Sequence, residues 1–92
     1  MGKYRGRAEA LAEDLKTYQP KRYKAIKKDG EDPTDVAERF LDGVMRSQQM
    51  TLDTLKKQIP KDIPPEEMEW RLNEAEMQAE ELANEDIMNW LR

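Results

Sequence analysis

Apolar residues recur at steps of three and four along most of this chain, which is the spacing of one face of an α-helix. The clearest stripe is wide enough to face a core, and it consists of Val36, Ala37, Phe40, Leu41, Val44 and Met45. Alternating β-branched runs, which indicate strands, do not occur, and Val is present only twice. The pattern therefore predicts an all-α protein.

Proline and glycine divide this helical pattern into segments. We expect the first helix to end before Pro20, which opens a short second helix that stops at Gly30. Asp32 followed by Pro33 predicts the N-cap and first turn of the next helix. The Pro-Pro-Glu-Glu sequence at 64–67 predicts the start of a last helix, because both proline and acidic residues favour a first turn.

Weaker signals predict further divisions of the helices. The polar residues 47–49 interrupt the apolar stripe, and Thr51 has the features of a new N-cap. Gly43 lies inside the apolar stripe, where glycine weakens a helix relative to alanine. We therefore expect Gly43 to mark a place where another backbone approaches closely. An N-cap signal at Asn84 leaves open whether the last helix continues beyond it. Together these signals predict about five helices, with short helices packed on a long C-terminal helix, about 65–91.

The chemistry available to this chain is restricted by its composition. Its 92 residues suffice for one small domain, so 1–92 is treated as a single helical unit. Cys and His are both absent, which excludes disulfides, thiolate and imidazole ligands, and the Ser/His and Cys/His relays of nucleophilic catalysis. Neither a Gly-rich phosphate loop nor EF-hand spacing is present. We predict no enzyme activity, no catalytic residue, no metal site, no cofactor and no small-molecule substrate.

The sequence also carries no sign of membrane insertion. No stretch approaches the roughly 20 apolar residues that a membrane helix needs. The N-terminal residues lack both the apolar run of a secretory signal and the motif for myristoylation. We therefore expect a cytoplasmic protein that makes no contact with a membrane.

The last helix has apolar residues on two faces. Projected at about 100° per residue, one stripe is expected to pack on the other helices, and it holds Met68, Leu72, Ala75, Ala79, Leu82, Ala83 and Trp90. Trp70, Met77 and Met88 fall nearly opposite this stripe, surrounded by glutamates. Interfaces favour Trp and Met, so we predict that these three residues bind a protein partner or a second copy, with Trp90 as a further anchor. The alternative is that they are core residues of a central helix covered on two sides.

Charge is sorted along the chain. Residues 1–28 hold nine bases and three acids, whereas residues 61–92 hold three bases and ten acids. Basic and aromatic side chains that suit phosphates and bases occur together at the N-terminal end, namely Lys21, Arg22, Lys24, Lys27 and Lys28 with Tyr18 and Tyr23. The alternative is a solvated face that pairs with the acidic last helix, within one molecule or between copies. No helix-turn-helix, RRM or KH signature is present, so nucleic acid is the second choice of partner.

These patterns together predict a small acidic helical protein that acts by protein-protein contact. We expect a regulator or inhibitor that docks on a larger assembly, and an assembly that handles nucleic acid is one such partner. We also expect the protein to self-associate. The first alternative is a nucleic-acid-binding protein that uses the basic N-terminal third. The second alternative is a structural subunit of a larger particle.

Overall fold

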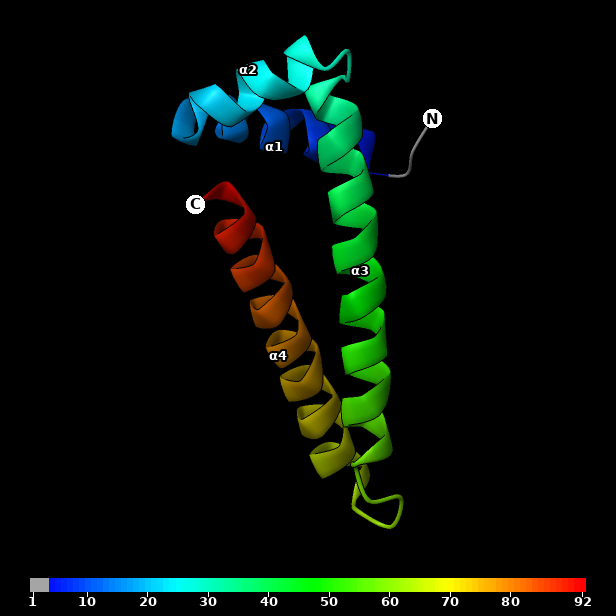
Figure 1. The fold of residues 1–92 in the computed structure, drawn as a ribbon. Helices are drawn as coiled ribbons and strands as arrows, with labels where there is room; N and C mark the ends of the chain where they lie inside the picture. The colour runs from blue at the N-terminus through cyan, green and yellow to red at the C-terminus, as the bar shows by residue number, and fades with distance from the viewer. Residues whose placement is uncertain (1–3) are drawn as a thin grey trace.

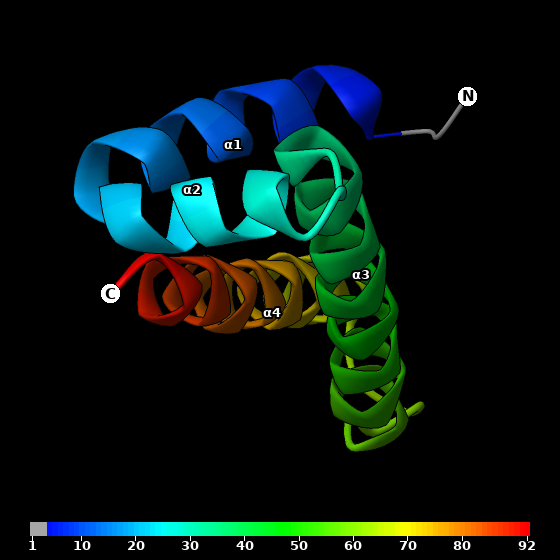
Figure 2. The same ribbon diagram turned by 45° about the horizontal axis from the view of Figure 1, so that its top comes forward.

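The computed structural model describes residues 4–92, and this part of the chain is all-helical, without strands. Its four helices are α1 (Arg5–Tyr18), α2 (Pro20–Lys28), α3 (Pro33–Lys57) and α4 (Pro65–Leu91). The long helices α3 and α4 form a hairpin, which we refer to as the stalk (Figure 1). The shorter α1 and α2 lie side by side across one end of the stalk and form the head (Figure 2).

The starts of three helices follow the proline signals. Pro20, Pro33 and Pro65 each occupy the first turn of a helix, where the missing backbone N–H has no helical partner in any case. The Asp32 carboxylate accepts a hydrogen bond of 2.9 Å from the backbone N–H of Thr34 and so caps α3. These predicted helix starts are confirmed.

The end of α2 is a Schellman motif. The N–H of Gly30 donates to the carbonyl of Lys27, and the N–H of Glu31 donates to the carbonyl of Ile26. Gly30 has a φ of 82°, in the left-handed region that glycine adopts without steric cost. The predicted stop at Gly30 is therefore confirmed, together with its physical reason.

The prediction of about five helices is wrong, because α3 continues through residues 47–49 and Thr51. This segment contains neither Pro nor Gly, and Gln is a good helix former. Polar residues on the exposed side of a helix leave the backbone hydrogen bonds intact, and Ser47 and Gln49 are exposed. α4 likewise continues past Asn84 to its end. The described chain thus has four helices, of which the last is the longest.

Two residues that the helical pattern assigned to the interior lie at the surface. Gly43 is exposed, and a Cβ placed on it would meet nothing within 4 Å, so it marks no close backbone approach. Leu82 is 50% exposed because it lies at the edge of the inner stripe of α4. Both expectations about these residues are therefore corrected.

The core is small and rich in alanine. Its buried apolar residues come from three helices and are Ala8, Leu11, Ala12, Leu15, Ala37, Leu41, Val44, Ala75, Ala79 and Ala83. Among the described residues, Leu15 and Leu41 are the only large side chains that are buried almost completely. Short side chains let helices approach one another, but they remove little apolar surface from water.

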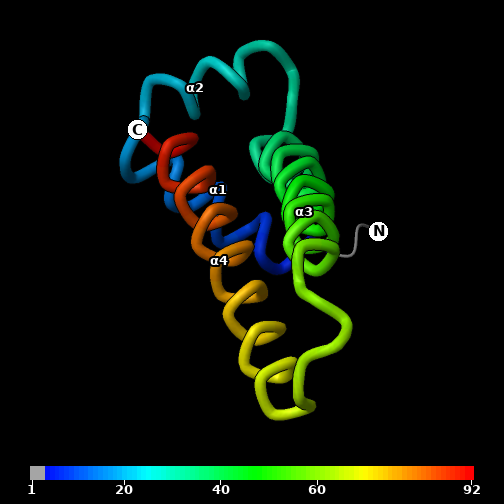
Figure 3. The backbone as a smooth tube through the Cα atoms, turned by 90° about the horizontal axis from the view of Figure 1, so that it is seen from below, coloured from blue at the N-terminus to red at the C-terminus, as the bar shows by residue number. Residues whose placement is uncertain are grey.

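The molecule is elongated for its length. Its radius of gyration is 17.0 Å and its extents are 56 × 25 × 17 Å, whereas a compact domain of this length has a radius of gyration of about 12 Å. Its accessible surface is 6894 Å², against about 5500 Å² for a compact monomer of the same mass. The shape arises because α3 and α4, of 25 and 27 residues, are long helices paired as a hairpin, and only the ends far from their connecting loop meet the head (Figures 1 and 3).

Candidate protein-docking surface

The side of α4 that faces away from the core carries three large apolar side chains. Trp70 is 63% exposed, Met77 is 61% exposed and Met88 is 56% exposed. The buried residues of α4 are three alanines on the opposite side of the helix, so the three large side chains point to solvent. The structure thus brings Trp70, Met77 and Met88 to one surface of the helix, as the periodicity predicts, and they are not core residues.

Acidic side chains surround this apolar surface. α4 contains nine Asp and Glu residues and one base. That base, Arg71, pairs with Glu67 at 3.0 Å, and no other acidic residue of α4 forms an ion pair within residues 4–92. The surface comprises Trp70, Glu74, Met77, Glu81 and Met88, and we refer to it as the outer face of α4. It is apolar at its centre and negatively charged around it.

Trp90 lies on the inner side of α4 and does not belong to the outer face. Its ring stacks on Phe40 of α3, with 4.7 Å between ring centroids and 13° between planes. The guanidinium of Arg22 lies 4.7 Å from the centroid of the same ring. Arg22 also donates a hydrogen bond of 2.7 Å to the backbone carbonyl of Trp90, one of the carbonyls left free at the end of a helix. Trp90 therefore holds the C-terminal end of α4 against α2 and α3.

The basic residues of α2 do not share one surface. Lys21, Lys24 and Lys28 recur at steps of three and four on the outward side of α2, and we refer to them as the lysine row. All three are exposed, and none forms an ion pair with another described residue. Arg22 is half-buried and directed toward Trp90, so it does not share the surface of the lysine row.

The two tyrosines of the predicted basic site have different surroundings. Tyr18, at the end of α1, is 68% exposed. Tyr23 is half-buried, and the ammonium groups of Lys16 and Lys27 lie 5.8 Å and 5.2 Å from its ring centroid. These cation-π contacts occupy the ring and reduce its capacity to stack on a base. Lys27 is also exposed, but its ammonium group lies over the Tyr23 ring, so Tyr18 and the lysine row are the exposed parts of this predicted site without such a contact.

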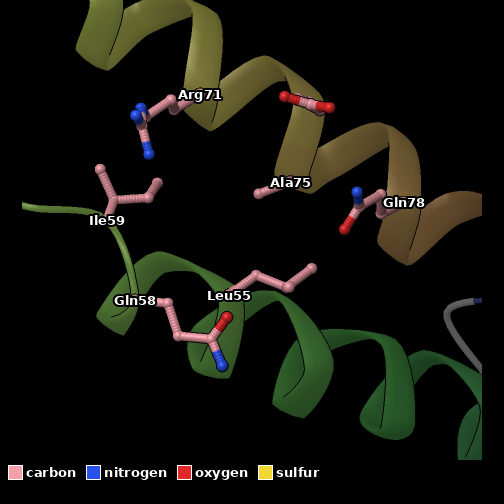
Figure 4. Close-up of a pocket in the computed structure, with 7 residues that line it drawn as sticks. Leu55, Gln58, Ile59, Arg71, Ala75 and Gln78 are labelled. Carbon is pink, nitrogen blue, oxygen red and sulfur yellow. The ribbon is translucent and has the colours of Figure 1, made fainter.

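An open pocket lies in the stalk near the loop that joins α3 to α4 (Figure 4). It has a volume of about 220 Å³, and Leu55, Gln58 and Ile59 face Arg71, Ala75 and Gln78 across it. The sequence pattern does not indicate this pocket, because its width depends on how two helices diverge and not on either helix alone. Its lining mixes apolar and exposed polar side chains, including Glu74 at the border of the outer face, and defines no class of ligand.

Met50 is another large apolar residue at the surface. It lies within the continuous helix α3 and is 71% exposed. Singly exposed apolar residues are common on protein surfaces. Met50 lies on α3, so it does not extend the outer face of α4.

Comparison of the chain with protein-family models, with curated proteins and with solved structures finds no match to any of them. Within residues 4–92, no helix has the combination of length and apolar content required to cross a lipid bilayer.

Proposed function

We propose that this protein acts by protein-protein contact through the outer face of α4. The observation that carries the proposal is the exposure of Trp70, Met77 and Met88, which is 56% or more, on a helix whose other side is already buried. A helix at the surface of a self-sufficient monomer needs only one apolar side. Trp is enriched among the residues that dominate binding energy, and Met adapts to irregular partners.

The charges around the apolar residues define the chemistry of the partner. Glu74 and Glu81 favour a partner whose apolar pocket has a basic rim, because complementary charge speeds association and selects between partners. We infer that the protein is a cytoplasmic regulator or inhibitor that occupies a site on a larger assembly. A nucleic-acid-handling assembly fits this chemistry, since its basic groove would accept an acidic helix.

Site-specific photocrosslinking tests the proposal. A benzophenone amino acid replaces Met77 in one variant and, as the control, exposed Ser47 of α3 in another. The Met77 variant is expected to form a covalent product of fixed mass with a partner protein, and the Ser47 variant is not. The partner is then purified, and its dissociation constant is measured for the wild type and for Trp70→Ala. We expect the substitution to weaken binding by about tenfold or more, and equal binding by both proteins contradicts the proposal.

Nucleic-acid binding by the head is a second candidate function. It is favoured by the lysine row, whose ammonium groups lack acidic partners among the described residues, and by exposed Tyr18. Binding to phosphates weakens steeply as salt rises. Fluorescence anisotropy with a labelled oligonucleotide tests this function, with a triple alanine variant of the lysine row as the comparison. Absence of binding at low salt contradicts it.

A further inference from the structure

We propose that a second copy of this chain covers the outer face of α4 with its lysine row when no other partner is bound. This inference rests on the proposed function, because it takes the same outer face as the binding surface. It adds the identity of the occupant. The occupant surface is Lys21, Lys24 and Lys28 of α2, supported by the exposed ring of Tyr18.

The lysine row and the outer face of α4 carry opposite charges that the fold leaves uncompensated. α2 contains five basic residues and no acid, whereas α4 contains nine acids and one base. Among the described residues, no ion pair joins α2 to α4, and Arg22 contacts α4 through the backbone carbonyl and the ring of Trp90, not through a carboxylate. The basic head of one molecule is therefore free to complement the acidic stalk of another.

The charges on the two surfaces have the same spacing along their helices. Lys21 and Lys28 are seven residues apart on α2, and Glu74 and Glu81 are seven residues apart on α4, on either side of Met77 in the sequence. At 1.5 Å per residue, each pair spans about 10.5 Å along its helix axis. Both lysines can thus face both glutamates at once when the two helices lie alongside one another.

The exposed area of the chain is sufficient for a protein-protein contact of standard size. The chain exposes about 1400 Å² more surface than a compact monomer of its mass. A protein-protein interface of standard size needs about 800 Å² from each partner. The surplus is therefore large enough for such a contact without any change in the fold.

Charge also selects the lysine row over a second α4 as the occupant. Pairing two outer faces would bring together two helices that each have nine acids and one base, and like charges oppose such a contact. A contact between head and stalk joins two different surfaces. It closes as a reciprocal dimer or continues as a chain of molecules, depending on the rotation between neighbours.

Charge reversal tests the inference, with sedimentation equilibrium as the measurement. The wild type is expected to associate at about 0.01 M salt and to dissociate at about 0.5 M salt, where charges are screened within a few ångströms. The variants Lys21→Glu/Lys28→Glu and Glu74→Lys/Glu81→Lys are each expected to associate about tenfold or more weakly than the wild type. An equal mixture of the two variants restores association, because the reversed charges again complement one another.

Matched controls separate this contact from a general effect of charge. Glu76→Lys/Glu80→Lys changes the net charge by the same amount as Glu74→Lys/Glu81→Lys, but on another side of α4. Lys56→Glu/Lys57→Glu changes the net charge by the same amount as Lys21→Glu/Lys28→Glu, but on α3. Both controls are expected to associate as the wild type does. Circular dichroism confirms that each variant keeps its helix content.

A second measurement uses the wild type alone, so it does not depend on any variant folding. A carbodiimide reagent joins contacting Lys and Glu residues in a mixture of ¹⁴N and ¹⁵N chains. Peptides of mixed label that join Lys21 or Lys28 to Glu74 or Glu81 support the proposed contact. A wild type that stays monomeric at about 1 mM chain and low salt, or charge-reversed variants that do not associate when mixed, overturns it. Neither result contradicts the proposed function. The proposed function is contradicted if Trp70→Ala leaves binding to the partner protein unchanged.

Discussion

Arg22 of α2 and Trp90 of α4 meet where the head joins the stalk, although 68 positions separate them in the chain. The Arg22 guanidinium lies 4.7 Å from the centroid of the Trp90 ring and donates a 2.7 Å hydrogen bond to the Trp90 carbonyl. With Phe40 stacked on the same ring, these residues form a clamp on the C-terminal end of α4. The core is small, so we expect this clamp to contribute a large share of the stability.

Arg22→Gln removes the positively charged guanidinium group from the clamp. We expect the free energy of unfolding to fall by about 1–2 kcal/mol, since both a cation-π contact and a charged hydrogen bond are lost. Urea denaturation followed by circular dichroism measures the change. Arg22→Lys is the comparison, and it should lie between the wild type and the Gln variant because Lys keeps the charge without the planar fork. Equal stability of all three proteins contradicts a structural role for the clamp.

Alanine substitutions at the two tryptophans are expected to change the free energy of unfolding by different amounts. Trp90→Ala removes a ring packed on Phe40 and Arg22, and we expect a loss of about 2 kcal/mol in stability. Trp70→Ala alters a side chain that is 63% exposed, so its effect on stability should stay within about 0.5 kcal/mol. Thermal unfolding of the isolated chain measures both, at a concentration and salt where it is monomeric. A larger loss for Trp70→Ala shows that the outer face stabilises the monomer.

Two glycine substitutions test the backbone of α3 and the end of α2. Gly43→Ala should raise the stability by about 0.5–1 kcal/mol, because Gly43 is inside a helix and its Cβ position is open. Gly30→Ala should lower the stability by about 1 kcal/mol, because the φ of Gly30 is 82°. Denaturant midpoints measure the two changes. Destabilisation by Gly43→Ala would restore the idea of a close contact at that position.

Arg5 joins the start of α1 to the first turns of α3. Its guanidinium donates hydrogen bonds to Asp35 and Glu38, and these bonds raise the pKa of Arg5 above its ordinary value. A raised pKa in the folded state stabilises the fold at every pH below the unfolded pKa, and this stabilisation is lost only as the pH rises through the folded value. Arg5→Gln should therefore lower the Tm by the same amount at about pH 7 and about pH 10. Differential scanning calorimetry at both pH values checks this, and a smaller difference at the higher pH contradicts it.

The helix boundaries were predictable because they depend on neighbouring residues. Asp32 and Pro33 act within one turn of the start of α3, and Gly30 acts within one turn of the end of α2. The outer face of α4 was predictable for a similar reason, since the periodicity of one helix decides which residues lie opposite its buried alanines. The break predicted at 47–49 failed because polarity alone does not interrupt backbone hydrogen bonds.

Other features depend on contacts between distant parts of the chain. The pattern placed Trp90 on the inner side of α4, but its partners Phe40 and Arg22 come from other helices and leave no periodic signal. The divergence of α3 and α4, visible in Figure 1, and the pocket near Ile59 likewise depend on how helices pack. No property of one segment predicts it.

The alanines of α4 have one further consequence. Ala75, Ala79 and Ala83 repeat every four residues, so sliding α4 by about 6 Å along its axis replaces each alanine by the next. The buried seam by itself thus distinguishes poorly between two registers. Trp90 occurs once in this position, so we expect its contacts with Phe40 and Arg22 to favour the observed register. Weakening those contacts should let α4 slip by one turn before the helix itself unravels.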